Sequence, residues 1–223
     1  MTTKIEIKNR FTGSILFDFE CDGNTILKTV LEALRQKKCL ISADLRSADL
    51  RFADLSLADL RYADLSLADL RFADLRYAKL SSAKLLSADL RFADLRYADL
   101  ISADLILANF ILADLSLAKL STADLCSAKL SSANLGFAYF RENEKSAKAA
   151  IFTGLYRYLV IPYITETGEK RIKMGCYNRS LQEWETDFWN NPDDFPNDGS
   201  EASKLRLMAF NTAKEWFKIV SNE

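Results

Sequence analysis

Histidine is absent from the 223-residue chain, and this absence excludes several kinds of active site. Hydrolases with an imidazole general base need this residue, and so do metal sites with imidazole ligands. Glycine and proline are also scarce, with 7 and 3 residues, against usual frequencies of about 7% and about 5%. The few glycines form no phosphate-binding loop motif, so we expect no enzyme and no cofactor.

An excess of charge of one sign is also lacking, because 30 basic residues balance 31 acidic ones to a net charge of -1. This balance argues against a chain that binds nucleic acid through a strongly basic surface. The four cysteines form no CxxC motif and predict reduced thiols without a metal site: Cys21, Cys39, Cys126 and Cys176. The first residues lack the apolar segment of a secretory signal, and the apolar run 151–164 is too short to cross a membrane. We therefore expect a cytoplasmic protein without membrane contact.

A five-residue repeat occupies almost half of the chain, from residue 41 to residue 140. Alanine recurs at twenty consecutive positions, from Ala43 to Ala138. Two residues after each alanine stands leucine, with Phe110 and Phe140 as the exceptions. The residue between them is usually aspartate and otherwise lysine, asparagine or tyrosine. The repeating unit is thus A-(D/K/N)-L-x-x.

A period of five fits neither a straight helix nor a flat strand. In a helix, successive leucines would lie about 140° apart and form no apolar stripe. In a strand, an odd period would turn successive leucines to opposite faces. The remaining solution is a chain that bends once per unit, so that each unit forms one side of a coil. Stacked coils would then enclose a column of alanine and leucine.

The spacing of near-identical segments indicates how many sides each coil has. The pair Arg-Phe recurs at every fourth unit, at 51–52, 71–72 and 91–92, and the segments 71–80 and 91–100 are near-copies. A recurrence at every fourth unit predicts a coil with four sides. A history of sequence duplication would leave the same spacing, so the period alone does not separate the two explanations.

Tandem A-D-L-x-x units resemble the pentapeptide repeat family over about 100 of the 223 residues. The resemblance implies a β-solenoid, namely a right-handed quadrilateral parallel β-helix, here of about five coils. It also implies that the central residue of each unit and the alanine before it point inward. We expect that inward column to include Ala43, Leu45, Ala63, Leu65, Leu85, Ala93, Leu95, Leu105, Phe110 and Leu125.

The two flanks predict caps for the open ends of this column. Residues 1–40 predict a β-hairpin, with strands over 4–8 and 15–20, and then a helix from Ile26 to about Lys37 capped by Asn24 or Thr25. Unpaired edges of a β structure promote aggregation unless they are covered. We therefore divide the chain into a hairpin and helix cap (1–40), a β-helix (41–140) and a C-terminal α+β capping domain (141–223).

The C-terminal segment contains all three tryptophans and all three prolines. A short helix is expected over 142–150, and a hairpin over 156–164 and 170–176. Ser180 predicts the N-cap of a helix that reaches about Asn190, with Glu183 completing a capping box. A second helix is expected over 201–220, with the residues available for packing being Leu205, Met208, Ala209, Trp216, Phe217 and Val220. The last repeats would meet this domain through Phe137, Tyr139 and Phe140.

The variable outward positions form the candidate partner-binding surface. In the register of four units per coil, one column combines arginine with phenylalanine and the next combines arginine with tyrosine. These residues are Arg51, Phe52, Arg71, Phe72, Arg91 and Phe92, followed by Arg76, Tyr77, Arg96 and Tyr97. Arginine with aromatics can bind nucleic acid, but region 41–140 has 7 Arg and 4 Lys against 13 Asp. A solvated face, with each arginine paired to an outward aspartate on a neighbouring side, is the simpler interpretation. The exposed aromatics favour a protein partner.

Two functional hypotheses follow for the chain. The first is a non-enzymatic scaffold that binds another macromolecule, most simply a protein. The second rests on the family resemblance: some members mimic DNA and regulate or protect DNA gyrase or another topoisomerase. Mimicry requires a strongly negative surface, and the balanced charge of this repeat weighs against it. The chain would act as a monomer, or as a homodimer formed through the C-terminal domain.

Overall fold

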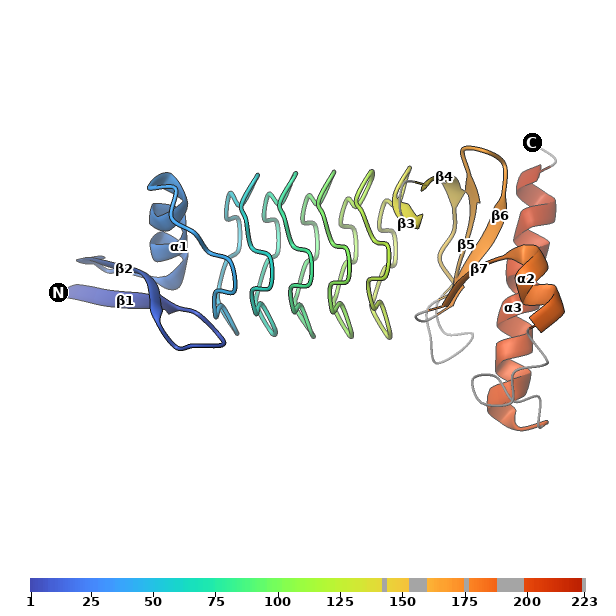
Figure 1. Ribbon diagram of the computed structural model, residues 1–223, viewed down its shortest axis with the longest axis horizontal. Helices are drawn as coiled ribbons and strands as arrows, with labels where there is room; N and C mark the ends of the chain where they lie inside the picture. Colours follow the sequence, from blue (N-terminus) through green and yellow to red (C-terminus); the bar gives the residue numbers. More distant parts are fainter. Residues whose placement is uncertain (142–143, 153–159, 175–176, 188–198, 222–223) are drawn as a thin grey trace.

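The computed structural model describes residues 1–141, 144–152, 160–174, 177–187 and 199–221. These residues form an elongated molecule, with a hairpin and a helix at one end, stacked coils in the middle, and a mixed region of sheet and two helices at the other end (Figure 1). Within these parts of the chain, no helix combines the length and the apolar character that a membrane crossing needs.

The N-terminal elements match the sequence-based prediction. Strands β1 (Thr2–Lys8) and β2 (Ile15–Asp22) pair antiparallel. Helix α1 (Ile26–Arg35) follows, and of the two predicted caps it is Thr25 whose side chain accepts the N–H of Lys28. The hairpin continues into the first coil, because the N–H of Asp44 donates to the carbonyl of Lys8 at 2.8 Å. This end of the column is therefore paired with the hairpin.

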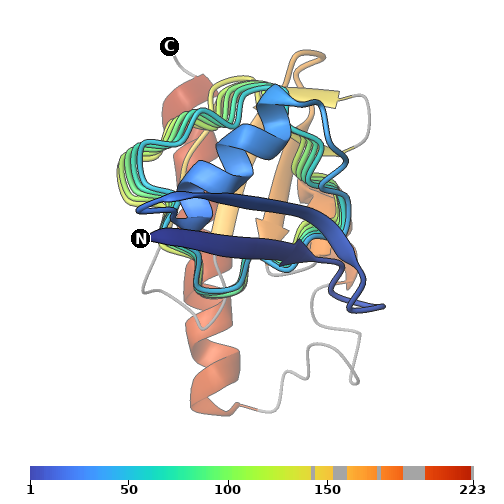
Figure 2. The same cartoon turned by 90° about the vertical axis from the view of Figure 1, so that its left-hand side faces the viewer.

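The repeats form a β-helix in which each coil takes four of the five-residue units. Parallel bridges join equivalent residues of successive coils throughout the region, from Asp44 with Asp64 to Lys119 with Tyr139. Each unit contributes one bridge, so a coil has four sides, and the coils superpose when viewed along the axis (Figure 2). At each side the backbone donates in both directions: Leu45 N–H to the Asp64 carbonyl and Asp64 N–H to the Ala43 carbonyl, both at 2.8 Å.

The coil turns at the residue before each alanine. Twenty such residues, from Ser42 to Phe137, have positive φ angles between 54° and 62°, and none of them is glycine. This left-handed conformation costs most residues energy, so each corner needs support from its neighbours. The next coil supplies it, since the N–H of Leu57 donates to the carbonyl of Arg76 at 2.9 Å. The repeat therefore turns without the glycines that such corners usually favour.

The alanine and the central residue of each unit fill the interior of the column. All ten residues of the expected inward column are buried: Ala43, Leu45, Ala63, Leu65, Leu85, Ala93, Leu95, Leu105, Phe110 and Leu125. The same apolar cluster continues into Ile7 and Val30 of the N-terminal elements and into Ile161 and Tyr163 of the C-terminal sheet. The column and both flanks thus share one hydrophobic core.

A five-stranded antiparallel sheet follows the coils, in the order β3-β4-β5-β6-β7. Its strands are β3 (Tyr139–Arg141), β4 (Glu144–Ala149), β5 (Val160–Thr165), β6 (Lys170–Met174) and β7 (Tyr177–Ser180). The helix predicted over 142–150 is wrong, because its described part is strand β4. The last coil offers its backbone for pairing, and the N–H of Ser146 donates to the carbonyl of Ala138 at 3.0 Å. Tertiary pairing here overrides local helix propensity.

The predicted hairpin of the C-terminal segment is present as β5 and β6, with Gly168 at φ 87° in the turn. Residues 156–159 and 175–176 of that prediction, including Cys176, lie outside the described residues. Helix α2 (Leu181–Asp187) begins with the predicted capping box: Glu183 N–H donates to the Ser180 hydroxyl, and Ser180 N–H donates to the Glu183 carboxylate. The predicted end of this helix near Asn190 also lies outside the described residues.

Helix α3 (Glu201–Ser221) packs through a face that matches the expected one only in part: Ala209 and Phe217 are buried and Trp216 is partly buried, as predicted. Its buried apolar residues are Ala209, Phe210, Ala213 and Phe217, which join Trp184 and strands β5 and β6 in a second core cluster. Leu205 and Met208 were expected to pack but are exposed, because the buried stripe of 3–4 spacing passes through Ser203 and Arg206 instead. The spacing of apolar residues in the sequence did not distinguish the face with Leu205 and Met208 from the face with Ser203 and Arg206.

The contact between the last coil and the sheet uses only part of the predicted apolar end. Phe140 is buried, and its ring lies 4.9 Å from that of Tyr163. Phe137 remains 49% exposed, so its predicted docking role is wrong. It occupies a corner position with φ 56°, and the side chains at those positions point away from the column.

Candidate functional site

The arginines of the candidate surface are held by aspartates of the same side of the coil. In Arg51, Nε donates to Asp49 Oδ1 at 2.8 Å and Nη2 donates to Asp49 Oδ2 at 2.6 Å. The two residues flank an inward leucine, so both side chains leave the same face. The same two-pronged pairing holds Arg46, Arg61, Arg71, Arg76, Arg91 and Arg96. The predicted Arg–Asp pairs are present, but their predicted placement across neighbouring sides is wrong, because each arginine binds the aspartate two residues before it in the same unit.

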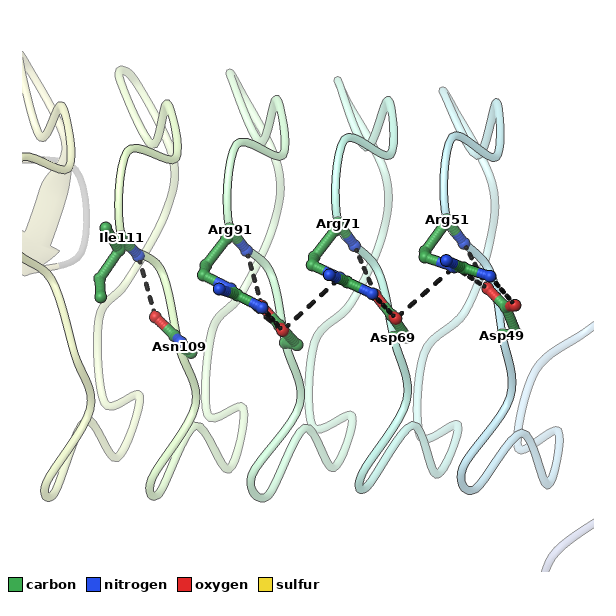
Figure 3. Close-up of polar contacts among 8 residues, drawn as sticks. Asp49, Arg51, Asp69, Arg71, Arg91, Asn109 and Ile111 are labelled. Carbon is green, nitrogen blue, oxygen red and sulfur yellow. Dashed lines mark hydrogen bonds and ion pairs between the residues drawn. The ribbon is translucent and has the colours of Figure 1, made fainter.

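These pairs also connect successive coils. Arg51 Nε lies 3.6 Å from Asp69 Oδ2. Arg71 repeats the contact with Asp89 at 3.7 Å. The resulting row of alternating charge, which we call the Arg–Asp ladder, runs from Asp49 to Arg91 (Figure 3). It ends because Asn109 replaces aspartate in the next coil and accepts the N–H of Ile111. A shorter ladder of the same kind joins Arg76 to Asp94 at 3.8 Å.

The ladder keeps its carboxylates ionised. Hydrogen bonds from the Arg51 side chain lower the pKa of Asp49 to about 2. At Asp69 and Asp74 the side-chain hydrogen bonds from Arg71 and Arg76 lower the pKa as well. At Asp89 burial acts in the opposite direction, yet its hydrogen bonds with Arg91 leave the pKa below its usual value. The surface is therefore dense in charge but locally neutral.

Protonation of the aspartates in the Arg–Asp ladder is expected only at a pH below the ordinary pKa of an aspartate side chain. Because the folded-state pKa of Asp49 is lowered, its stabilising effect is present above the unfolded value of about 4 and is lost as the pH falls through about 2. We expect the Asp49 carboxyl to titrate near 2 by NMR. In Arg51→Gln it should titrate near 4, whereas Arg61→Gln, which changes another side, should leave it unchanged. Titration near 4 in the unaltered protein would contradict the ladder.

Aromatic rings stack along two corners of the coil. The rings of Phe52 and Phe72 lie 5.0 Å apart, and those of Phe72 and Phe92 lie 4.8 Å apart, with interplanar angles of 4°. We call these three residues the Phe edge. Tyr77 and Tyr97, stacked at 4.7 Å, form the Tyr edge on the next corner. The coil spacing matches the separation of neighbouring strands, which brings equivalent rings into stacking distance.

The structure brings the ten candidate residues onto two adjoining faces, with the Phe edge between them. All five aromatic side chains are exposed, Phe52 most of all at 71%. The residues that sequence analysis missed extend both edges with aliphatic side chains: exposed Leu112 follows the Phe edge, and exposed Leu57 precedes the Tyr edge. The register of four units per coil could have found them, because each occupies the same position in an adjacent coil as an aromatic residue.

The candidate surface combines rows of paired arginine and aspartate side chains with neighbouring rows of exposed apolar side chains. The arginines are already bound to aspartates, so they offer little net charge to a polyanion. The exposed aromatic and leucine side chains offer apolar area in straight rows, which suits contact with another protein. These features define a repeat protein that folds as a β-helix and presents ordered side-chain rows on its faces.

The family model for pentapeptide repeats, which itself spans eight copies of the unit, matches residues 39–76, 73–110 and 108–142. The chain belongs to the pentapeptide repeat family. No curated protein sequence matches the chain.

Solved structures of pentapeptide repeat proteins are similar to this chain. One from the thylakoid lumen of Arabidopsis thaliana is 35% identical over 44% of this chain and 68% of its own, with a TM-score of 0.43. One from Nostoc PCC 7120 is 34% identical over 53% of this chain and 87% of its own, with a TM-score of 0.26. HetL, involved in heterocyst differentiation regulation in Nostoc sp. strain PCC 7120, is 34% identical over 50% of this chain, with a TM-score of 0.36. The match spans about half of HetL, 49% of its chain.

Proposed function

We propose that this protein is a non-enzymatic scaffold that binds another protein through the Phe edge and the Tyr edge. The observation that carries the proposal is the stacking of exposed rings at 4.7–5.0 Å along straight rows. Stacking and the underlying backbone ladder restrict the rings, so little side-chain entropy would be lost on binding. Aromatic residues are also the side chains that most often dominate the energy of protein interfaces.

The charge of the same faces supports a protein partner over a nucleic acid. Each arginine of the surface is held by a carboxylate, so a phosphate would compete with an existing two-pronged pair. An apolar strip on the partner would instead meet the rings without breaking any ion pair. We therefore expect binding that depends weakly on salt concentration.

Removal of two stacked rings is expected to weaken partner binding. With Phe72→Ser and Phe92→Ser combined, affinity for a partner isolated from the source organism should fall at least about tenfold, because aromatic anchors carry much of an interface energy. The matched control is Leu67→Ser with Leu107→Ser, which removes exposed apolar side chains from corner positions of another edge. Surface plasmon resonance measures both. Equal affinity of the ring variant and the unaltered protein would refute the proposal.

A DNA mimic that regulates or protects DNA gyrase or another topoisomerase is the alternative that the family resemblance raised. Mimicry needs uncompensated negative charge. The seven arginines of the coils are each paired with an aspartate, which removes much of that charge. The Arg–Asp ladder therefore counts against this alternative and favours the protein-binding scaffold.

The finer features of the architecture complete the proposal. We propose a right-handed β-helix of about five coils over residues 41–140, a cap over 1–40 and a capping α+β domain over 141–223. The shared core cluster supports capping at both ends, since it joins the column to Val30 and to Tyr163. A cytoplasmic location and a monomer or a homodimer formed through the C-terminal domain stay predictions.

A further inference from the structure

One face of the column lies between the Phe edge and the Tyr edge, and we call it the inter-edge face. Each of its sides begins at a corner of the first edge and ends at a corner of the second, as from Phe72 to Tyr77. Beyond the rings, Leu112 continues the first row of corners, and Leu117 and Phe137 continue the second. The inter-edge face is therefore bordered on both sides by apolar side chains over four coils.

The surface between these two borders carries more acidic than basic side chains. Its outward charged residues are four aspartates and two arginines, which gives a net charge of -2: Asp54, Asp74, Asp94, Asp114, Arg76 and Arg96. Arg76 and Arg96 bind Asp74 and Asp94 in the shorter ladder. Asp54 and Asp114, at the two ends of this row, form no ion pair with any residue that the structure describes. The negative charge of the face is therefore concentrated at its two ends.

Each of these two carboxylates has one oxygen available to a donor. Oδ1 of Asp54 accepts the N–H and the hydroxyl of Ser56 at 3.0 and 2.6 Å. Oδ1 of Asp114 accepts the N–H of Ser116 at 2.9 Å and the side-chain amide of Asn134 at 3.1 Å. Within the described parts of the chain, no donor binds Oδ2 of either aspartate. An ionised carboxylate oxygen accepts strong hydrogen bonds from cations, so both ends of the face can bind a lysine or an arginine.

The spacing of the coils fits a helix better than an extended strand. Parallel bridges align Asp54 with Asp114 in one column, three coils apart, which corresponds to about 14 Å. Stacked rings along the borders repeat every 4.7–5.0 Å. A helix lying along the column repeats its contact face about every 5.4 Å, and a strand repeats its contact face about every 6.7 Å. After three coils the helix is out of register by about 2 Å, but the strand by about 6 Å.

We propose that the inter-edge face binds a basic amphipathic helix of a partner protein, which lies along the axis of the column. The inference rests on the proposed function, because the Phe edge and the Tyr edge supply its apolar contacts. A lysine or arginine near each end of the contact face of the helix binds Asp54 and Asp114. With only two such ion pairs, the dependence on salt stays weak. A second copy of this face would place carboxylates against carboxylates, so the charge disfavours it as the occupant.

Fluorescence anisotropy of labelled synthetic peptides, titrated with the full chain, tests the inference. The first peptide is an alanine-rich helix of about eighteen residues, with leucines along one face and two lysines about eleven positions apart on that face. The second peptide has glutamates in place of the lysines, and the third has a central proline that breaks the helix. We expect saturable binding of the lysine peptide, at least about tenfold tighter than that of either other peptide.

A double variant locates the site on this face. Asp54→Asn with Asp114→Asn should weaken binding of the lysine peptide at least about fivefold, because it removes both carboxylates. Asparagine is compatible with these positions, since Asn109 already accepts the N–H two residues after it. The matched control is Asp64→Asn with Asp124→Asn, which makes the same change of charge at the same separation of three coils, on another face. The control should bind the lysine peptide as the unaltered protein does, and equal weakening by both double variants would overturn the assignment of this face.

The possible results separate this inference from the proposed function. Equal binding of the lysine and glutamate peptides, or a proline peptide that binds as tightly as the lysine peptide, would overturn the basic helix as the occupant. The absence of saturable binding at about 1 mM would also overturn it. If the combined Phe72→Ser and Phe92→Ser variant still loses its partner, only the helix inference fails. If that variant keeps its full affinity for the partner, the scaffold proposal fails whatever the peptides show.

Discussion

Leu95→Asp is expected to prevent the β-helix from folding. Leu95 is fully buried at the centre of the column, and no described cation lies inside the column to pair with a carboxylate. The loss of a buried leucine side chain and the burial of a charge together should cost more than about 5 kcal/mol, a large part of the stability of an ordinary domain. Circular dichroism and denaturant unfolding measure the effect.

Leu57→Asp is the matched control for this prediction. It makes the same chemical change and the same change of net charge, but at a corner residue that is 72% exposed. Aspartate also tolerates the left-handed conformation of this corner better than leucine does. We expect a change in unfolding free energy within about 0.5 kcal/mol. Equal destabilisation by the two variants would contradict the division into inward and outward positions.

Ala93→Leu is expected to overfill the same column. Ala93 is buried between coils whose equivalent positions, Ala73 and Ala113, are also alanine and also buried. A leucine there adds volume that neither neighbour can release, because hydrogen bonds on both sides fix the coil spacing. We expect a loss of about 3 kcal/mol, measured as a shift of the denaturation midpoint.

Ala202→Leu provides the comparison for overpacking. This alanine lies exposed in the first turn of α3, where a larger side chain meets solvent. Leucine is also a good helix former, so stability should stay within about 0.5 kcal/mol of the unaltered protein. If Ala93→Leu lowered the unfolding free energy no more than Ala202→Leu does, the interior of the column would be loosely packed and the prediction would be wrong.

The regular part of the molecule was predictable because its physics is local and repeated. An odd period of five excluded a flat strand, and the recurrence of Arg51 at Arg71 and Arg91 indicated coils of four units. The capping box of Ser180 and Glu183 was also visible, since it depends on two residues three positions apart. In each case the information lay within a few residues or was repeated many times.

The remaining features depended on contacts between distant residues. Strand β4 forms because the end of the column provides backbone groups for it to hydrogen-bond with. The local sequence of 144–149 does not predict this pairing. The buried face of α3 is chosen by the sheet, which left Met208 exposed. At the candidate site, the residue types and the columns were predictable, whereas the particular aspartate that holds each arginine required the geometry of the coil.

The register of four units per coil also governs how such a protein can change in length. Removal of four consecutive units would leave every later column in line, with rings above rings and aspartates beside arginines. Removal of one unit would rotate everything after it by one side of the square, so Phe92 would no longer lie above Phe72. The repeat region can therefore gain or lose only whole coils of four units if its side-chain rows are to stay aligned. The aligned rows indicate that any past change in length inside this region occurred in steps of four units.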